Sequence, residues 1–104
     1  MSIQFKTIKD LSTMLKNKDI SNKELVQDTY SLIKSNVHLN AFVTLNEEAS
    51  LKKAEELDKN KSSGNLAGIP IAQKDLFCTK DLRTTCGSKM LSNFIPPYSA
   101  TVIE

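Results

Sequence analysis

The residue of this sequence with the clearest capacity for chemistry is Lys74, a lysine within an apolar stretch. If residues 69–75 form a strand, their side chains alternate between its two faces. The residues that share a face with the lysine are then Pro70, Ala72 and Leu76. An ammonium group on such a face loses water, which favours the neutral amine that a general base needs. Lys74 is therefore a candidate general base, although its stem could instead lie on apolar surface with the ammonium in solvent.

The other side chains that could carry chemistry lack suitable partners. Two Ser-x-x-Lys pairs, at 31–34 and 50–53, lie on amphipathic helical patterns, and chance alone produces such pairs in a chain rich in serine and lysine. His38 is the only histidine, and no pattern places a serine and an acidic residue with it, so we expect a structural role for it and no Ser-His-Asp triad. The three glycines form no phosphate-binding pattern, and nucleotide binding by this chain has no support.

Four further residues have both a functional and a structural interpretation. Arg83 could bind an anion, although a solvated arginine is the commoner case. Ser88 precedes Lys89, but adjacent residues of a helix do not face each other, so we expect a turn or capping role for the serine. Cys78 and Cys86 are too few and too far apart for a common zinc pattern, and we expect free thiols.

The bulk composition narrows the class of protein. The 104 residues fit one small domain or one part of a larger one, and 39% of them are hydrophobic. The formal net charge of +2 favours no particular partner, and lysines and glutamates are interspersed over 47–61 as on a solvated helix face. The sequence shows no signal-peptide pattern and no membrane-spanning stretch. We therefore expect a soluble cytoplasmic protein that binds no metal and contacts no membrane.

Capping patterns predict where the first two helices begin. Thr7-x-x-Asp10 resembles a capping box, with aspartate in place of the usual glutamate or glutamine. Ser21-x-x-Glu24 is a capping box for a second helix, which should end near residue 36. Because the connection between them is short, the two helices are expected to form a hairpin.

Two short segments are expected to be strands. Residues 41–45 are β-branched and aromatic, and residues 69–75 surround the lysine described above. Between them Asn46 can cap a third helix, with acidic residues in its first turn and lysines near its end. The run at 60–65 is the most linker-like part of the chain. This order of helices and strands predicts an α/β fold.

The part after the second expected strand has fewer regular patterns. A short helix is expected around 89–93, and Ser99 can cap a further helix that begins at Ala100 and of which only the first turn, to Glu104, is expected here. We therefore expect N-terminal helices with one short strand over 1–64. Residues 65–104 form a second part, which contains the strand expected at 69–75.

Several segments together resemble the amidase signature family. Gly-Ile-Pro-Ile-Ala-Gln-Lys-Asp at 68–75 is the first, and Arg-Thr-Thr-Cys-Gly-Ser-Lys-Met-Leu at 83–91 is the most distinctive. Shorter similarities lie at 39–43, 78–80 and 96–102. The resemblance covers essentially the whole chain, and it is strongest to the branch of the family formed by the A subunits of tRNA-dependent amidotransferases.

This resemblance implies a chemistry and a set of partners. Family members use a Ser–cis-Ser–Lys triad, in which the lysine accepts a proton through the bridging serine while the second serine attacks an amide carbonyl. Lys74 matches the family lysine. The resemblance also implies that residues 65–104 are the beginning of a mixed-sheet catalytic region that is incomplete here. In this branch the A subunit releases ammonia from glutamine. The B and C subunits complete a heterotrimer that amidates mischarged tRNA, converting Glu-tRNA(Gln) or Asp-tRNA(Asn) to Gln-tRNA(Gln) or Asn-tRNA(Asn). The complex uses ATP, and this chain is expected to bind no cofactor.

One part of the family pattern has no counterpart here. The Gly- and Ser-rich segment that carries both serines would lie after Glu104, so we expect an N-terminal fragment without glutaminase activity of its own. Its two strands would have open edges, from which we expect partial folding or aggregation. Direct tRNA binding is not supported, because no basic stripe with aromatic residues is present. The alternatives are a fragment of another amidase-signature hydrolase and a non-catalytic remnant or interaction module.

Overall fold

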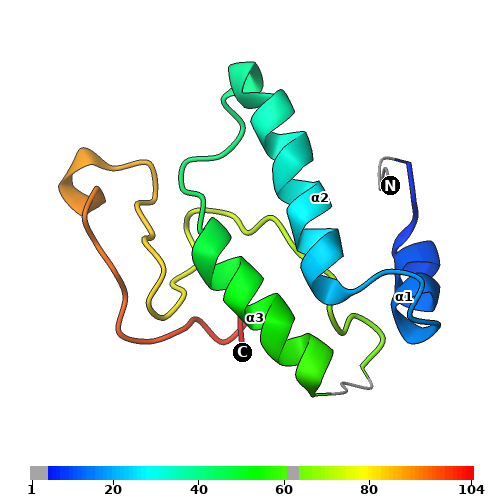
Figure 1. Cartoon of the computed structure of the whole chain (residues 1–104). Helices are drawn as coiled ribbons and strands as arrows, with labels where there is room; N and C mark the ends of the chain where they lie inside the picture. Colours follow the sequence, from blue (N-terminus) through cyan, green and yellow to red (C-terminus); the bar gives the residue numbers. More distant parts are fainter. Residues whose placement is uncertain (1–4, 61–63) are drawn as a thin grey trace. The chain divides into compact units, whose positions relative to one another are not determined.

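A computed structural model describes residues 5–60 and 64–104 of the chain. Its helical elements, in chain order, are α1 (Ile8–Lys16), α2 (Asn22–Ser35), the 3-10 helix η1 (Val37–Leu39), α3 (Glu47–Lys59) and the 3-10 helix η2 (Lys89–Leu91) (Figure 1). The chain divides into two compact units. The helical unit comprises the described residues up to 41 and those between 46 and 70, and the loop unit comprises 42–45 and 71–104. None of the described helices is long and apolar enough to cross a membrane.

Helix α1 begins with the predicted capping box. The Thr7 hydroxyl oxygen accepts a hydrogen bond from the backbone N–H of Asp10 at 3.1 Å. The Asp10 carboxylate in turn accepts one from the backbone N–H of Thr7, also at 3.1 Å. This reciprocal pair satisfies N–H groups that the start of a helix otherwise leaves without partners. The sequence prediction for this helix start is confirmed.

Helix α2 is capped from two parts of the chain. The Ser21 hydroxyl oxygen accepts from the backbone N–H of Glu24 at 3.1 Å, as predicted. The Asp58 carboxylate, from the last turn of α3, also accepts from the backbone N–H groups of Asn22 at 2.8 Å and Lys23 at 3.2 Å. A carboxylate at a helix N-terminus is also favoured by the helix dipole. Asp58 thereby ties the end of α3 to the start of α2.

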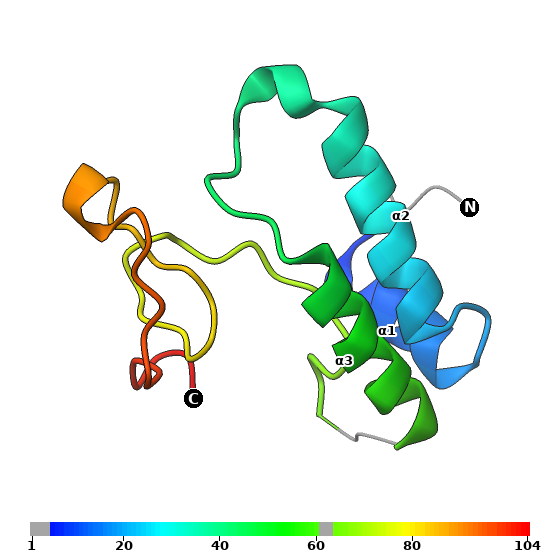
Figure 2. The ribbon, with the colours of Figure 1, turned by 60° about the vertical axis from the view of Figure 1, so that its left-hand side comes forward.

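Helices α2 and α3 lie side by side and share one cluster of buried side chains (Figure 2). Val26 and Tyr30 of α2 pack there with Ala54 of α3. The Tyr30 hydroxyl donates a hydrogen bond to the Asn46 side-chain oxygen at 3.0 Å, and the Ser50 hydroxyl donates to the same oxygen at 3.1 Å. Asn46 thus stands immediately before α3, as predicted, but its side chain joins the two helices and does not cap α3.

A second buried cluster joins α1 to α2. Leu11 of α1, Ile20 of the connector and Leu25 of α2 form its centre. The flanking apolar residues that pack on it are Met14, Leu15 and Ile69. Burial of apolar surface stabilises by about 25 cal/mol per Å². Because both clusters are small, the helical unit depends strongly on its caps as well as on its core.

Gly68 closes the helical unit with a backbone conformation that favours glycine. Its φ is +80°, in the left-handed region. A Cβ atom at this position would lie 1.9 Å from the side-chain oxygen of Asn22. Both the conformation and the close approach therefore require the absence of a side chain.

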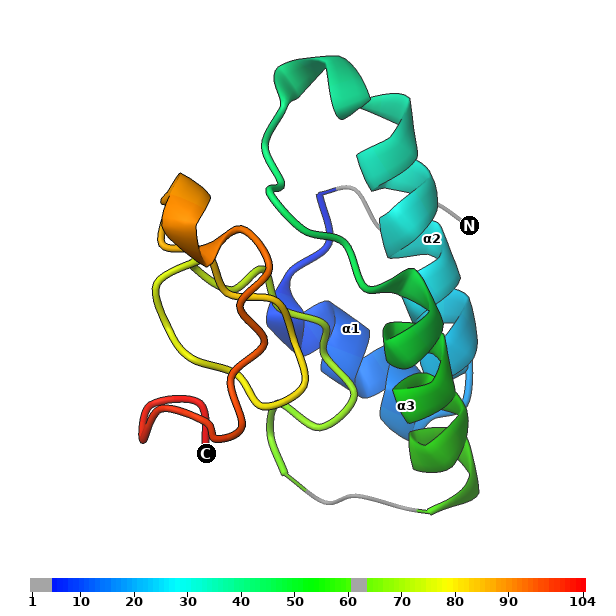
Figure 3. The ribbon, with the colours of Figure 1, turned by 90° about the vertical axis from the view of Figure 1, so that its left-hand side faces the viewer.

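The two predicted strands do not form. Residues 41–45 and 69–75 are irregular, and the described chain contains only one isolated bridge, between Thr79 and Leu82 (Figure 3). A strand needs a neighbour whose backbone groups complete its hydrogen-bond ladder, and no described segment pairs with either stretch. Within residues 5–60 and 64–104 the expected mixed sheet is therefore absent, and the predictions of strands at 41–45 and 69–75 are wrong.

Hydrogen bonds between successive turns hold the loop unit together. The backbone N–H of Asp81 donates to the carbonyl of Pro96 at 3.1 Å, and the N–H of Thr84 donates to the carbonyl of Phe94 at 3.0 Å. Pro96 and Thr84 are both buried. Residues 79–84 and 94–96 therefore lie together without forming a regular ladder.

The C-terminal expectations are met in part. The short helix predicted around 89–93 is the 3-10 helix η2, and the Ser88 hydroxyl oxygen accepts from the N–H of Met90 at 3.2 Å, which is the expected turn role. The helix expected after Ser99 is wrong, because only a turn is present there. The Ser99 hydroxyl oxygen instead accepts from the backbone N–H of Lys80 at 3.0 Å.

Candidate active site around Lys74

Lys74 lies in the loop unit at the start of a turn. Its backbone carbonyl accepts a hydrogen bond from the N–H of Phe77 at 3.2 Å. Its side chain is exposed, and so are those of Ala72 and Leu76, which were expected to form an apolar face with it. The predicted desolvation of the lysine is therefore wrong for this structure, because no layer of side chains covers that face. Among the described contacts, none joins its ammonium group to another residue.

The residues on either side of Lys74 are held by side-chain hydrogen bonds. The Gln73 amide donates to the hydroxyl oxygen of Thr79. The Asp75 carboxylate accepts from the backbone N–H of Thr85 at 2.8 Å and from the Thr85 hydroxyl. The backbone on both sides of the lysine is thus tied to the loop unit, while the amine itself is open to solvent.

The contact between Asp75 and Thr85 is more buried than the contact between Gln73 and Thr79. Thr85 is only 3% exposed. The backbone N–H of Cys86 donates to the Asp75 carbonyl at 2.7 Å, and the N–H of Gly87 donates to the Thr85 hydroxyl oxygen at 3.2 Å. The hydroxyl and backbone N–H of Thr85 hold the pKa of the Asp75 carboxyl below its ordinary value. Both oxygens of the carboxylate therefore accept a hydrogen bond from Thr85, and these bonds favour its ionised form.

Sequence reasoning did not single out Asp75 or Thr85. The available signal was an acidic residue next to the candidate base, together with a threonine pair before the Cys-Gly turn. These residues lie 10 positions apart without helical or strand periodicity between them. Their contact follows from a turn whose residues Cys86 and Gly87 both have positive φ, of 52° and 70°.

Arg83 joins separate parts of the loop unit. Its guanidinium donates to the Thr44 hydroxyl oxygen at 2.7 Å and to the Val43 carbonyl at 3.4 Å. It also donates to the carbonyl of Ser92. The side chain is half-buried and hydrogen-bonded, so Arg83 is not a freely solvated surface arginine. Arg83 holds residues 42–45 against the rest of this unit.

The two Ser-x-x-Lys pairs belong to the helical unit, and Lys74 belongs to the loop unit. The Ser50 hydroxyl donates to the side chain of Asn46, as described above. The Lys34 ammonium pairs with the Glu47 carboxylate at 2.9 Å. Neither contact joins the serine of a pair to its own lysine, which agrees with the interpretation of both pairs as chance matches.

The remaining candidates show no convergence of reactive groups. His38 is exposed on η1. Cys78 is half-buried and Cys86 is exposed, and both are free thiols, as predicted. Within residues 5–60 and 64–104, no three histidine, cysteine, aspartate or glutamate side chains come together as a metal site.

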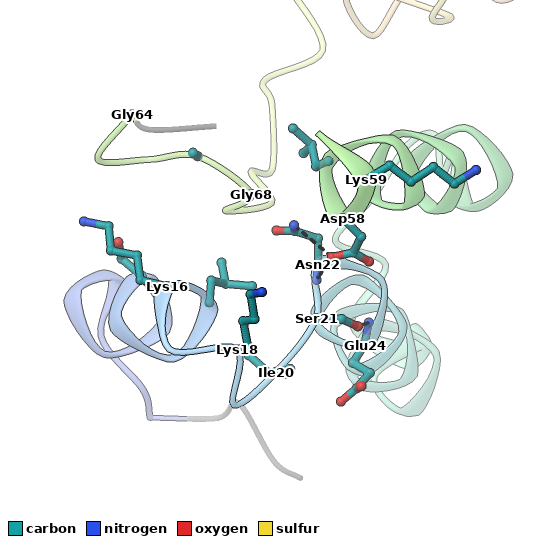
Figure 4. A pocket seen from close by; sticks show the side chains of 14 residues that line it. Lys16, Lys18, Ile20, Ser21, Asn22, Glu24, Asp58, Lys59, Gly64 and Gly68 are labelled. Carbon is teal, nitrogen blue, oxygen red and sulfur yellow. Dashed lines mark hydrogen bonds between the residues drawn. The ribbon is translucent and has the colours of Figure 1, made fainter. Parts of the chain in front are cut away.

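The helical unit contains a hollow of about 650 Å³ between α1, the start of α2 and the end of α3 (Figure 4). Its lining mixes charges of both signs, including Lys16, Lys18 and Asp58. Figure 4 shows the Asn22 side chain between Asp58 and Gly68, where its oxygen is buried without a hydrogen-bond partner. The Asn22 amide nitrogen donates to the Asp58 carboxylate at 3.0 Å. This hollow therefore has no set of groups directed at one kind of ligand.

Comparison with known proteins defines the class to which this architecture belongs. The family model described as Amidase matches residues 24–104, which is most of the chain and includes Lys74 and all of the loop unit. The chain therefore belongs to the amidase family. The family expected from segments 68–75 and 83–91 is thereby confirmed.

Curated relatives point to one kind of polypeptide within that family, the A subunit of glutamyl-tRNA(Gln) amidotransferase. The chain is 52% identical over 103 residues to this protein of Coxiella burnetii (strain Dugway 5J108-111), covering 95% of this chain and 21% of the relative. It is 52% identical over 102 residues to the protein of the same name from Nitrosomonas europaea (strain ATCC 19718), covering 94% of this chain and 21% of the relative. It is 49% identical over 100 residues to that of Legionella pneumophila (strain Corby), covering 93% and 21%. The chain spans about a fifth of the length of these relatives.

Proposed function

We propose that this chain is part of the glutaminase subunit of a tRNA-dependent amidotransferase. The observation that carries the proposal is identity at about half of all positions, over 95% of the chain, with the A subunit of glutamyl-tRNA(Gln) amidotransferase. The glutaminase subunit releases ammonia from glutamine. The ammonia then serves to convert Glu-tRNA(Gln) to Gln-tRNA(Gln), or Asp-tRNA(Asn) to Asn-tRNA(Asn).

In the proposed mechanism Lys74 is the general base. It takes a proton, through a bridging serine, from a second serine that attacks the side-chain amide carbon of glutamine. Lys74 returns this proton through the bridging serine to the leaving nitrogen, so that ammonia departs and an ester forms on the second serine. Water then cleaves this ester, which releases glutamate and restores the serine hydroxyl. Both serines belong to a Gly- and Ser-rich segment that is not among these 104 residues. The exposed amine on a tied turn supports this role, because the amine is open to a partner that the chain itself does not supply.

The proposal includes a covering layer over the loop unit. Residues 65–104 are proposed to begin the catalytic region, a mixed-sheet domain that is completed by residues which the relatives have and these 104 residues lack. Apolar side chains that are exposed here support this, among them Ile71 at 77% and Leu76 at 46%. Covering Leu76 would also desolvate Lys74, which favours the neutral amine that accepts a proton.

The partners are proposed from the relatives' names and from the resemblance. A protein named as the first of several lettered subunits implies the others, which we take to be the B and C subunits of a heterotrimer. The use of ATP and the contact with mischarged tRNA are assigned to the complex and not to this chain. Protein synthesis places such a complex in the cytoplasm.

A chimera with a relative tests the proposal, because the relative supplies the part of the subunit that these 104 residues lack. This chain replaces the matching fifth of the Coxiella burnetii relative, and the chimera is co-expressed with the other subunits of that enzyme. We expect glutamine-dependent formation of Gln-tRNA(Gln). A chimera that assembles with its partners and melts cooperatively, yet neither releases ammonia from glutamine nor amidates Glu-tRNA(Gln), would contradict the proposed function.

A further inference from the structure

We infer that Asp75 and Thr85 are positioning residues for Lys74, because their contact fixes the point of the backbone from which the amine extends. The inference rests on the proposed function, in which Lys74 is the general base. It assigns a role in the reaction to two residues that do not themselves touch the substrate.

Three hydrogen bonds converge on Asp75 from the turn at 85–87. The carboxylate receives two of them, from the backbone N–H and the hydroxyl of Thr85. In the third, the backbone N–H of Cys86 donates to the backbone carbonyl of Asp75. Both the side chain and the main chain of the residue next to Lys74 are thus held by one turn.

Burial makes the Thr85 hydroxyl hard to replace. At 3% exposure Thr85 has little access to water, so a lost hydrogen bond is not readily exchanged for one to solvent. The same hydroxyl oxygen also accepts from the N–H of Gly87 at 3.2 Å. Removal of this oxygen therefore loosens the turn and the carboxylate together.

The lysine depends on this anchor because its own side chain has no other support in the described chain. Lys74 is exposed, and no described hydrogen bond or ion pair holds its ammonium. If the backbone to which this long, flexible side chain is attached moves, the amine will be in a productive geometry with its proton donor less often. A displacement of about 1 Å at a catalytic group can lower the rate by about 100-fold.

Thr84 provides a matched control for Thr85. It is the preceding residue and equally buried, at 2% exposure. Its hydroxyl donates to the Leu82 carbonyl at 3.1 Å and makes no described contact with Asp75. The substitutions Thr84→Val and Thr85→Val each remove one buried hydroxyl from the same turn region, but only the second breaks a bond to the residue next to Lys74.

The experiment measures kcat and KM for glutamine hydrolysis, and Tm, in the assembled chimera carrying Thr85→Val, Thr85→Ser or Thr84→Val. We expect Thr85→Val to lower kcat about tenfold or more, with KM for glutamine changed less than about twofold. Thr85→Ser restores the hydroxyl and should recover kcat to within about threefold of the parent. Thr84→Val should leave kcat within about twofold while lowering Tm by an amount similar to Thr85→Val.

Equal kcat values for Thr84→Val and Thr85→Val, whether both high or both low, would overturn the inference. Failure of Thr85→Ser to recover kcat would overturn it as well. If Thr85→Val does not melt cooperatively, Asp75→Asn replaces it, and an unchanged kcat in that variant refutes the positioning role. Lys74→Met in the same chimera distinguishes a failure of this inference from a failure of what it rests on. Glutaminase activity retained in Lys74→Met contradicts the role of Lys74 as the general base, whereas activity lost in Lys74→Met together with an unchanged kcat in Thr85→Val contradicts the positioning inference alone. A parent chimera that assembles but has no glutaminase activity contradicts the proposed function.

Discussion

Replacement of Gly68 by alanine should destabilise the helical unit through two separate terms. The backbone at this position has φ +80°, which costs an L-residue about 1–2 kcal/mol. The new Cβ would also lie 1.9 Å from the Asn22 side-chain oxygen, so the Asn22 amide must move and lose its 3.0 Å hydrogen bond to Asp58. That loss costs about 1 kcal/mol. Reduced freedom of the unfolded chain offsets about 0.4–1 kcal/mol, which leaves a net loss of about 2 kcal/mol.

Urea unfolding followed by the circular dichroism of the helices measures this loss. Gly64→Ala is the control within the same unit, because its nearest neighbours would lie 4.0 Å from the new Cβ atom. We expect that control to change the free energy of unfolding by less than about 0.5 kcal/mol. In the double variant Asn22→Ala, Gly68→Ala the clash is gone, and the coupling energy should be about 1 kcal/mol. A loss below about 0.5 kcal/mol for Gly68→Ala, or additive effects in the cycle, would refute this reasoning.

Three further predictions follow from the caps and the loop unit. Asp58→Ala should lower the free energy of unfolding by about 1 kcal/mol, because α2 loses its second cap, whereas Glu56→Ala on the same helix should change it by less than about 0.5 kcal/mol in urea titrations. The pKa of the Asp75 carboxyl is held below its ordinary value of 3.8 by Thr85, so its stabilisation is present above that pH and is lost as the pH falls through the lower folded pKa. Hydrogen exchange of the Thr85 backbone amide, which donates to this carboxylate, should lose its protection as the carboxylate becomes protonated. In Asp75→Asn the protection of this amide should no longer change with pH in that range. The isolated chain should release no ammonia from glutamine, and serine-dependent release by the purified chain would contradict that expectation.

The helices could be predicted because their signals are local. Thr7 and Ser21 lie within four residues of the groups that they cap, and both caps are present in the structure. The second cap of α2 could not be found in this way, because Asp58 lies 36 positions from Asn22. A local pattern contains no information about a carboxylate that arrives from another helix.

The strands failed for the converse reason. Residues 41–45 and 69–75 have strand-like composition, but a strand exists only when a neighbour completes its hydrogen bonds. The apolar face predicted around Lys74 depended on the same missing layer, and the lysine is exposed. The fold of the loop unit depends on contacts such as that of Arg83 with Val43, 40 positions away, which periodicity cannot reveal.

In the candidate site, too, the residue with a local sequence signal could be predicted and the residues joined by a long-range contact could not. Lys74 could be selected from its residue type and neighbours, and the family resemblance of its segment is confirmed by the match over 24–104. Its role as a base is still a prediction. Asp75 and Thr85 emerge only from the structure, since their contact depends on the turn at 85–87.

The most direct test of the account is the glutaminase activity of the assembled chimera with and without Lys74. Lys74→Met keeps a long apolar stem and removes the amine, and Lys80→Met makes the same change at another exposed lysine of the loop unit. We expect Lys74→Met to lower kcat for glutamine hydrolysis by about 100-fold or more, as loss of a general base does, while Lys80→Met retains the parent rate. A Lys74→Met chimera that retains the parent rate would contradict the assignment of Lys74 as the base.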